Sequence, residues 1–175
     1  MSRRQTIMLG VIIERRAIDN PWQDYTYRPV AVVPGMSMME EGAGWRLIRE
    51  GDGWTHFHAA TLELELFAGE TEGYKANLSN FQPHVYVVLA PGEEAEDEEV
   101  VPKLVTACPY EAESYMEDSE MIVEGVAMPD ELAAWLGAFV DTFHVEETFQ
   151  KRKRNKAYDP RKGGFRPRPL VESDE

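Results

Sequence analysis

The sequence predicts a mainly β fold, an antiparallel barrel or sandwich of about seven or eight strands closed by one C-terminal amphipathic helix. Short runs rich in β-branched and aromatic residues recur between turn-forming residues along most of the chain. Within residues 56–66, apolar side chains recur at every second position, as on a half-buried strand. Near the C-terminus the apolar residues change to helical spacing. A chain of 175 residues is long enough to bury one core in this way.

The first half of the chain predicts four strands. Residues 5–14 and 25–33 are followed by turn formers, and residues 46–49 lead through Gly51-Asp52-Gly53 into the long run 54–67. Glycine and aspartate tolerate the positive φ of tight turns, so this tripeptide predicts a hairpin. Simple alternation along 56–66 places the leucines at even positions toward the core. On that pattern the histidines at 56 and 58 continue the leucine face and Glu63 points away from it.

The second half adds shorter segments. Residues 72–78, 84–90, 100–108 and 121–128 bring the strand count to seven or eight. Residues 93–99 hold six acids in seven positions, which predicts a solvated loop. Residues 109–120 are expected to form an acidic, tyrosine-bearing connection between the last two strands.

A helix is predicted over residues 130–147, extending to about residue 150. Pro129, Asp130 and Glu131 form a helix start. The apolar stripe follows i, i+3, i+4, i+7 spacing and consists of Leu132, Trp135, Leu136, Phe139, Val140 and Phe143. We expect the stripe to pack on the sheet, because a helix with one apolar face must bury it.

The charge divides the chain into two parts. Residues 151–175 hold nine basic and four acidic residues, a formal charge of +5, whereas residues 1–150 hold nine basic and 28 acidic residues, a formal charge of −19. We predict one β-rich domain over residues 1–150 and a basic, disordered tail over residues 151–175, whose Gly, Pro, Lys and Arg content cannot build a core. The acidic domain would repel nucleic acid and anionic lipid, so only the tail could attract them.

The chain is expected to be cytoplasmic. It has one cysteine, Cys108, and no apolar run approaching the roughly 20 residues of a membrane span. Ser2-Arg3-Arg4 followed by residues 7–13 superficially resembles an export signal, but charged residues follow at once and no cleavage pattern is present. Asn77-Leu78-Ser79 matches a glycosylation acceptor that a cytoplasmic protein would not use.

His56 and His58 form the sharpest local motif. Two histidines at i, i+2 on a strand point the same way and can share a divalent metal. The stretch from Gly51 to Gly69 resembles the first metal motif of cupins, which implies a small metal-dependent enzyme using these histidines with Glu63 or His84. It departs from that pattern by one residue in both glycine spacings, and the second cupin motif is absent. The alternative is two histidines where the core face meets solvent, with no cofactor.

The tail is the other functional candidate. Aromatic residues among cations suit an acidic protein groove or, alternatively, nucleic acid. The candidate partner-binding residues are Lys151, Arg152, Lys153, Arg154, Tyr158 and Phe165. We place a protein partner above nucleic acid. The alternatives without a partner are that the tail only keeps the protein in solution, or that it packs on the chain's own acidic domain.

The chain as a whole resembles an uncharacterised bacterial family known as domain of unknown function 3305. The likeness is distributed over Val11–Arg16, Pro21-Trp22, Arg28–Gly35, Leu62–Leu64, Tyr74–Ser79, Val85–Leu89, Thr106–Ala112, Met128-Pro129 and Phe149–Arg154. Members are typically encoded near genes for molybdenum- or tungsten-dependent formate dehydrogenases and their maturation factors. The resemblance implies a non-catalytic accessory, assembly or regulatory role for such an enzyme, with a dehydrogenase subunit or maturation factor as partner. It implies no catalytic residues.

Overall fold

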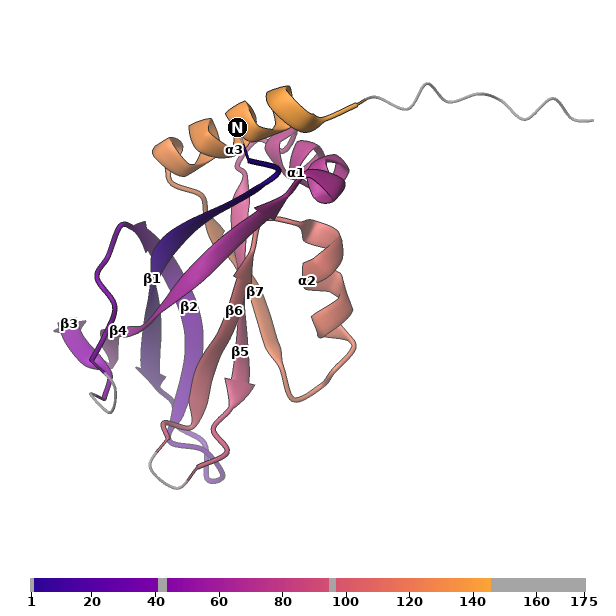
Figure 1. Cartoon of the computed structure of the whole chain (residues 1–175). Coiled ribbons are helices and arrows are strands. Elements are labelled where there is room, and N and C mark those ends of the chain that lie inside the picture. The colour runs from indigo at the N-terminus through magenta and orange to yellow at the C-terminus, as the bar shows by residue number, and fades with distance from the viewer. Residues whose placement is uncertain (1, 41–43, 95–96, 146–175) are drawn as a thin grey trace, which may run out of the picture. The chain divides into compact units, whose positions relative to one another are not determined.

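The computed structural model describes residues 2–40, 44–94 and 97–145. The described chain is mainly β, with two antiparallel sheets and three α-helices (Figure 1). The elements are β1 (Arg4–Ala17), β2 (Tyr25–Pro34), β3 (Arg46–Gly51), β4 (Trp54–Phe67), a 3-10 turn (Ala68–Glu70), α1 (Thr71–Leu78), β5 (His84–Pro91), β6 (Val100–Thr106), α2 (Pro109–Met116), β7 (Ile122–Ala127) and α3 (Asp130–Phe143). The first sheet has the order β2-β1-β4-β3 and the second has the order β6-β5-β7. The mainly β prediction is confirmed, and the closed-barrel alternative is wrong, because the described strands form two separate sheets.

The two sheets bury one core between them. In β1, Leu9, Val11 and Ile13 are fully buried, and in β5, Val85, Val87 and Leu89 are equally inaccessible. All of these residues belong to one apolar cluster. Strand β6 contacts β4 and β7 contacts β2, so the second sheet lies against β2, β1 and β4. Strand β3 extends past this overlap, which is why all six of its residues are exposed.

Two predicted elements have a different structure. The segment expected as the strand 72–78 is the helix α1, and the connection 109–120 contains the helix α2. Thr71, Tyr74 and Asn77 are buried at a spacing of three, which is a helical period that short-range alternation obscures. Pro109 stands at the first helical position of α2, where its missing N–H costs nothing. Helix α2 contacts β5, which explains why that strand is apolar on both faces.

Helix α3 confirms the predicted stripe. Leu132, Leu136, Phe139 and Val140 are buried, and Trp135 and Phe143 pack against the same core. The helix starts after Pro129 as predicted but ends at Phe143, earlier than expected. His144 leaves the helix in an extended conformation, and its Nδ1 lies 3.1 Å from the Thr71 hydroxyl of α1.

The chain divides into two units, residues 1–144 and 145–175. The predicted tail residues lie outside the described part of the chain. No helix among the described residues is long and apolar enough to cross a membrane.

Candidate functional site: an arginine face on the four-stranded sheet

A β-bulge decides which way the two histidines of β4 point. Val11 of β1 pairs with Ala60, whereas the next residue, Ile12, pairs with His58. The extra residue, Ala59, reverses the alternation of β4. Since Val11 faces the core, Ile12 and its partner His58 face outward. The prediction that the histidines share the leucine face is therefore wrong.

The same bulge brings other polar side chains to the histidines. Thr61 pairs with Gly10, on the outer face of β1, and Glu63 pairs with Met8 on that same face. The prediction that Glu63 points away from the histidines is also wrong. A second bulge in β3, between Leu47 and Arg49, turns both Arg46 and Arg49 outward, opposite His58 and His56.

A buried carboxylate lies at the centre of this outer face. Glu14 is only 5% exposed and occupies a row that crosses all four strands, in which Arg28, Glu14, His56 and Arg49 are successive cross-strand partners. Its Oε1 accepts hydrogen bonds from Arg16 Nε at 3.1 Å and Arg28 Nε at 3.3 Å. Its Oε2 lies 3.0 Å from His56 Nε2, and the other ring nitrogen of His56 accepts from Arg49 Nε at 3.4 Å.

These donors stabilise the charged form of the Glu14 carboxylate. The hydrogen bond from His56 is the largest cause, burial opposes it, and the bonds from Arg16 and Arg28 add to it. Together they lower the pKa of Glu14 from 4.5 to about 2. Glu14 therefore acts as a fixed anion that holds the guanidinium groups in place.

His58 is held as a neutral ring. The Thr61 hydroxyl donates to the Ser37 carbonyl at 2.8 Å, so its oxygen accepts from His58 Nε2 at 2.9 Å. The unprotonated Nδ1 then faces the Arg46 guanidinium at 3.5 Å. Burial, followed by the Arg46 charge, lowers the pKa of His58. A cation at Nδ1 would meet the same repulsion from Arg46.

This arrangement bears on the metal hypothesis for His56 and His58. Each ring is already engaged by its neighbours at both nitrogens. His84, the other proposed ligand, lies on β5 in the other sheet, with its ring against Gly125. Among the described residues, no group of three or more His, Cys, Asp or Glu side chains is placed to hold a metal ion. The metal site stays a prediction, without a third ligand in the described part of the chain.

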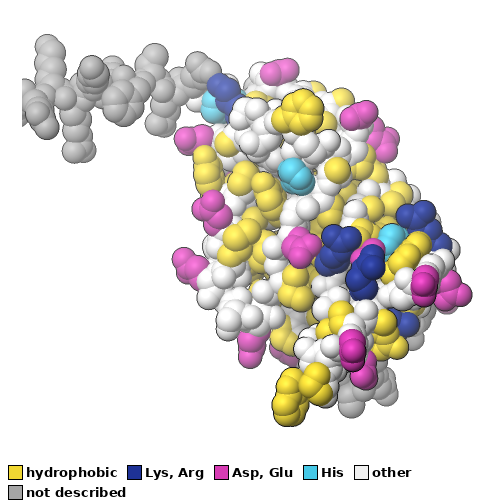
Figure 2. All heavy atoms as spheres, turned by 180° about the vertical axis from the view of Figure 1, so that it is seen from behind, with side chains coloured by type: hydrophobic (Ala, Val, Ile, Leu, Met, Phe, Trp, Pro, Cys, Tyr) yellow, Lys and Arg dark blue, Asp and Glu magenta, His cyan; other side chains and the backbone are white. Residues whose placement is uncertain are grey.

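We call the outer surface formed by Glu14, Arg16, Arg28, Arg46, Arg49, His56 and His58 the arginine face. It collects four of the nine basic residues that precede residue 151, in a region of formal charge −19. Figure 2 shows several basic side chains gathered with a histidine, hydrophobic side chains and some acidic side chains on one flank of the molecule, with other acidic side chains scattered over the rest of that view. The exposed apolar side chains of Val33 and Ile48 lie beside these arginines. The face thus combines guanidinium groups with apolar surface.

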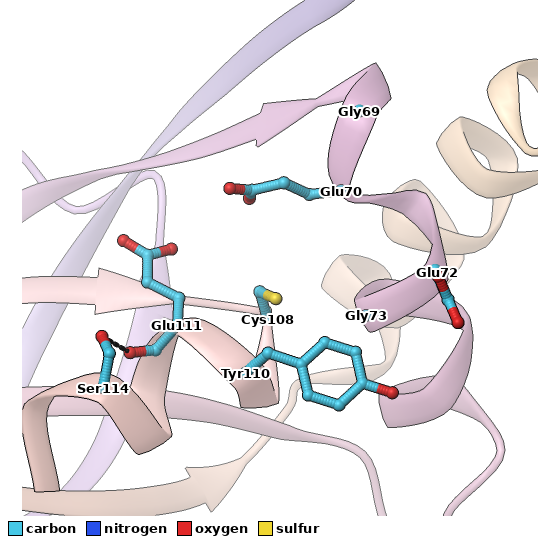
Figure 3. Close-up of a pocket in the computed structure, with 8 residues that line it drawn as sticks. All are labelled: Gly69, Glu70, Glu72, Gly73, Cys108, Tyr110, Glu111 and Ser114. Atoms are coloured by element: carbon cyan, nitrogen blue, oxygen red, sulfur yellow. Dashed lines mark hydrogen bonds between the residues drawn. The ribbon is translucent and has the colours of Figure 1, made fainter.

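A separate hollow of about 470 Å³ surrounds Cys108, on the other sheet's side of the fold (Figure 3). Its polar groups are acidic or neutral, and Glu111 accepts a hydrogen bond from Thr106 at 2.7 Å. Cys108 is 6% exposed and its Sγ lies against Gly73 of α1. The thiol fills the space between α1 and the start of α2, as expected of a buried cysteine.

We expect Gly73→Ala to destabilise the protein by about 1–2 kcal/mol, because an added Cβ would meet the Cys108 sulfur and overpack this joint. The gain in helix propensity of about 1 kcal/mol offsets only part of that cost. Urea unfolding of Gly73→Ala, Cys108→Ala and the double variant measures the effect. In the double variant the added methyl should cost almost nothing, and an unchanged cost would show that the sulfur is not the obstacle.

The fold and the face define this protein as a two-sheet antiparallel β protein that displays an arginine-lined surface on its four-stranded sheet. The chain belongs to the family described as "protein of unknown function (DUF3305)", whose model matches residues 8–153. It matches none of the curated proteins and none of the solved structures with which it was compared.

The sequence did not single out the arginines of this face. Glu14, Arg16 and Arg28 lie in segments expected only as strands, and their common face depends on bulges that alternation cannot reveal. The run Glu14-Arg15-Arg16 could have indicated a cluster of charged side chains, because charged residues inside a strand are rarely buried without partners.

Proposed function

We propose that this protein is a non-catalytic accessory protein, an assembly or regulatory factor that acts by binding a protein partner. The arginine face carries this proposal. Glu14 and His56 are engaged with each other and with arginines, and His58 is held by Thr61 and Arg46, so what the surface offers to solvent is guanidinium nitrogens beside apolar side chains. Arginine with exposed apolar side chains is the composition of recognition surfaces.

We further propose that the partner is a molybdenum- or tungsten-dependent formate dehydrogenase subunit or a maturation factor of such an enzyme, encountered in the cytoplasm. The support is the resemblance to a family whose members are typically encoded beside these genes, together with the match over residues 8–153.

In this proposal the basic tail, residues 151–175, makes the first contact with an acidic surface of the partner. The support is the division of charge, +5 in the tail against −19 in residues 1–150. Opposite charges steer association and raise its rate, and the effect falls with salt.

The test is affinity purification of the tagged protein from its native host, followed by mass spectrometry. We expect a dehydrogenase subunit or cofactor-insertion protein to be recovered with the full chain and to be lost, at least tenfold, when residues 151–175 are deleted. A variant with glutamine at Lys151, Arg152, Lys153 and Arg154 separates charge from length and should lose the partner as well. Equal recovery by the full and truncated chains would refute the tail's role.

A further inference from the structure

A hollow of about 510 Å³ opens on the arginine face. Its charged and polar lining comes from three strands besides β1: Arg28 from β2, His56 from β4 and Arg49 from β3. Glu14 lies on β1 between them. The apolar part of the lining consists of Ile12, Val30, Ala31, Val33, Met36 and Ile48.

Each of the two arginines in this hollow is held by one hydrogen bond, which leaves its terminal guanidinium nitrogens available to a ligand. Arg28 donates to Glu14 through Nε, and Arg49 donates to His56 through Nε, which orients each guanidinium. The terminal nitrogens of both groups have no protein acceptor among the described residues. A guanidinium presents these nitrogens as a fork that matches a carboxylate.

The charge inside the hollow suits a single negative charge. The residues that line the hollow hold two guanidinium groups and the ionised Glu14, a net charge of about +1, and Arg16, outside the lining, donates to the same Glu14 oxygen. A phosphate dianion or a polyphosphate would meet the Glu14 carboxylate at the same place. A carboxylate carries one negative charge, which the guanidinium groups of Arg28 and Arg49 can balance and hydrogen-bond.

The apolar surface extends beyond what a small carboxylate covers. Val33 is 38% exposed and Ile48 is 45% exposed at the rim. A second hollow, of about 620 Å³, shares Met36 with the first and adds Met38, Arg46 and the edge of His58. The two hollows therefore adjoin at Met36, and together they offer arginine and apolar side chains, with Glu40 as the acidic residue of the second hollow.

We propose that the hollow between Arg28 and Arg49 binds an acidic side chain of an extended segment on a partner protein, with the segment's apolar residues lying on Val33 and Ile48. This inference rests on the proposed function, because it assigns the partner a contact on the domain in addition to the tail. Charge and apolar surface together select the segment: an Asp or Glu flanked by apolar residues.

The experiment is selection of a displayed random peptide library on the full chain, followed by fluorescence anisotropy with the enriched peptides. We expect enrichment of an Asp or Glu with apolar neighbours. Changing that residue to Asn or Gln should weaken binding at least tenfold, as should the double variant Arg28→Gln, Arg49→Gln in the protein. The matched control is Arg4→Gln, an exposed arginine on the same sheet outside the hollow, which should leave the affinity unchanged.

Several results would overturn the inference. Enriched peptides without an acidic residue would do so, as would no enrichment, or equal binding by the double variant and the control. Displacement of the peptide by millimolar inorganic phosphate but not by acetate would assign the arginines to a phosphate group instead. If the enriched peptides do not bind but the full chain still captures its partner, this inference fails and the proposed function stands. If the peptides bind but no partner is captured from the host, the proposed function fails instead.

Discussion

Asn77→Ala should destabilise the protein by roughly 4 kcal/mol, the largest single-residue effect that we expect. Asn77 lies on α1, is fully inaccessible, and makes three hydrogen bonds to backbone groups. Its Nδ2 donates to the carbonyls of His84 at 2.7 Å and Ala107 at 2.9 Å, and its Oδ1 accepts from the His84 N–H at 3.0 Å. The side chain thus joins α1 to the start of β5 and to the residue before Cys108.

Alanine would leave these three backbone groups buried without partners. Each such group costs about 1–3 kcal/mol, and a few kcal/mol is a large part of a typical total stability of 5–15 kcal/mol. For a chain of this size the midpoint of thermal unfolding should fall by roughly 10 °C. Urea unfolding followed by tryptophan fluorescence measures the free energy, and amide hydrogen exchange should be faster at His84.

Asn80→Ala is the matched control, because Asn80 is exposed three residues further along and its side chain makes no hydrogen bond among the described residues. It should change stability by less than about 0.5 kcal/mol. Asn77→Asp tests the donor role, since aspartate keeps the acceptor for His84 but sets a carboxylate against two carbonyls. If Asn77→Ala resembles Asn80→Ala, or if aspartate is tolerated, the bracing role of Asn77 is refuted.

Asn77 also shows where inference from the sequence ends. The sequence places Asn77 in a predicted strand, in a glycosylation-acceptor pattern and in the stretch of family resemblance, yet the structure places it on α1 and buries it completely. Its three partners belong to residues seven and thirty positions away, so no local pattern could indicate them. Strands with strong alternation and the amphipathic stripe of α3 were predictable, because local periodicity records which face is buried.

The arginine face was hidden for a different reason. The extra residue Ala59 shifts the alternation between the two ends of β4, so the pattern that places the leucines after it correctly puts His56 and His58, which precede it, on the wrong face. Bulges have no reliable signature in one sequence. The residue types of the face were visible, but their assembly into one surface depends on cross-strand register.

Replacing Glu14 with glutamine should cost about 3 kcal/mol at pH 7, and the cost should disappear in acid. Hydrogen bonding from His56, Arg16 and Arg28 lowers the pKa of Glu14 from 4.5 to about 2. A carboxyl whose pKa is lower in the folded chain stabilises the fold fully above pH 4.5, and this contribution is lost as the pH falls toward 2. Glutamine carries no charge at any pH and cannot contribute it.

The measurement is the free energy of unfolding in urea for the unaltered protein and for Glu14→Gln, at several pH values between 7 and the acid limit of folding. The difference between them should be constant above pH 4.5 and should shrink below it. Glu65→Gln is the control, because Glu65 pairs with the exposed Arg4 on the same sheet and such surface pairs contribute at most about 1 kcal/mol. A difference for Glu14→Gln that stays the same into acid would mean that the carboxylate is not what holds the arginine face together.

Because Arg28 and His56 are both anchored on Glu14, and Arg49 is anchored on His56, loss of this charge should also weaken peptide binding at the hollow.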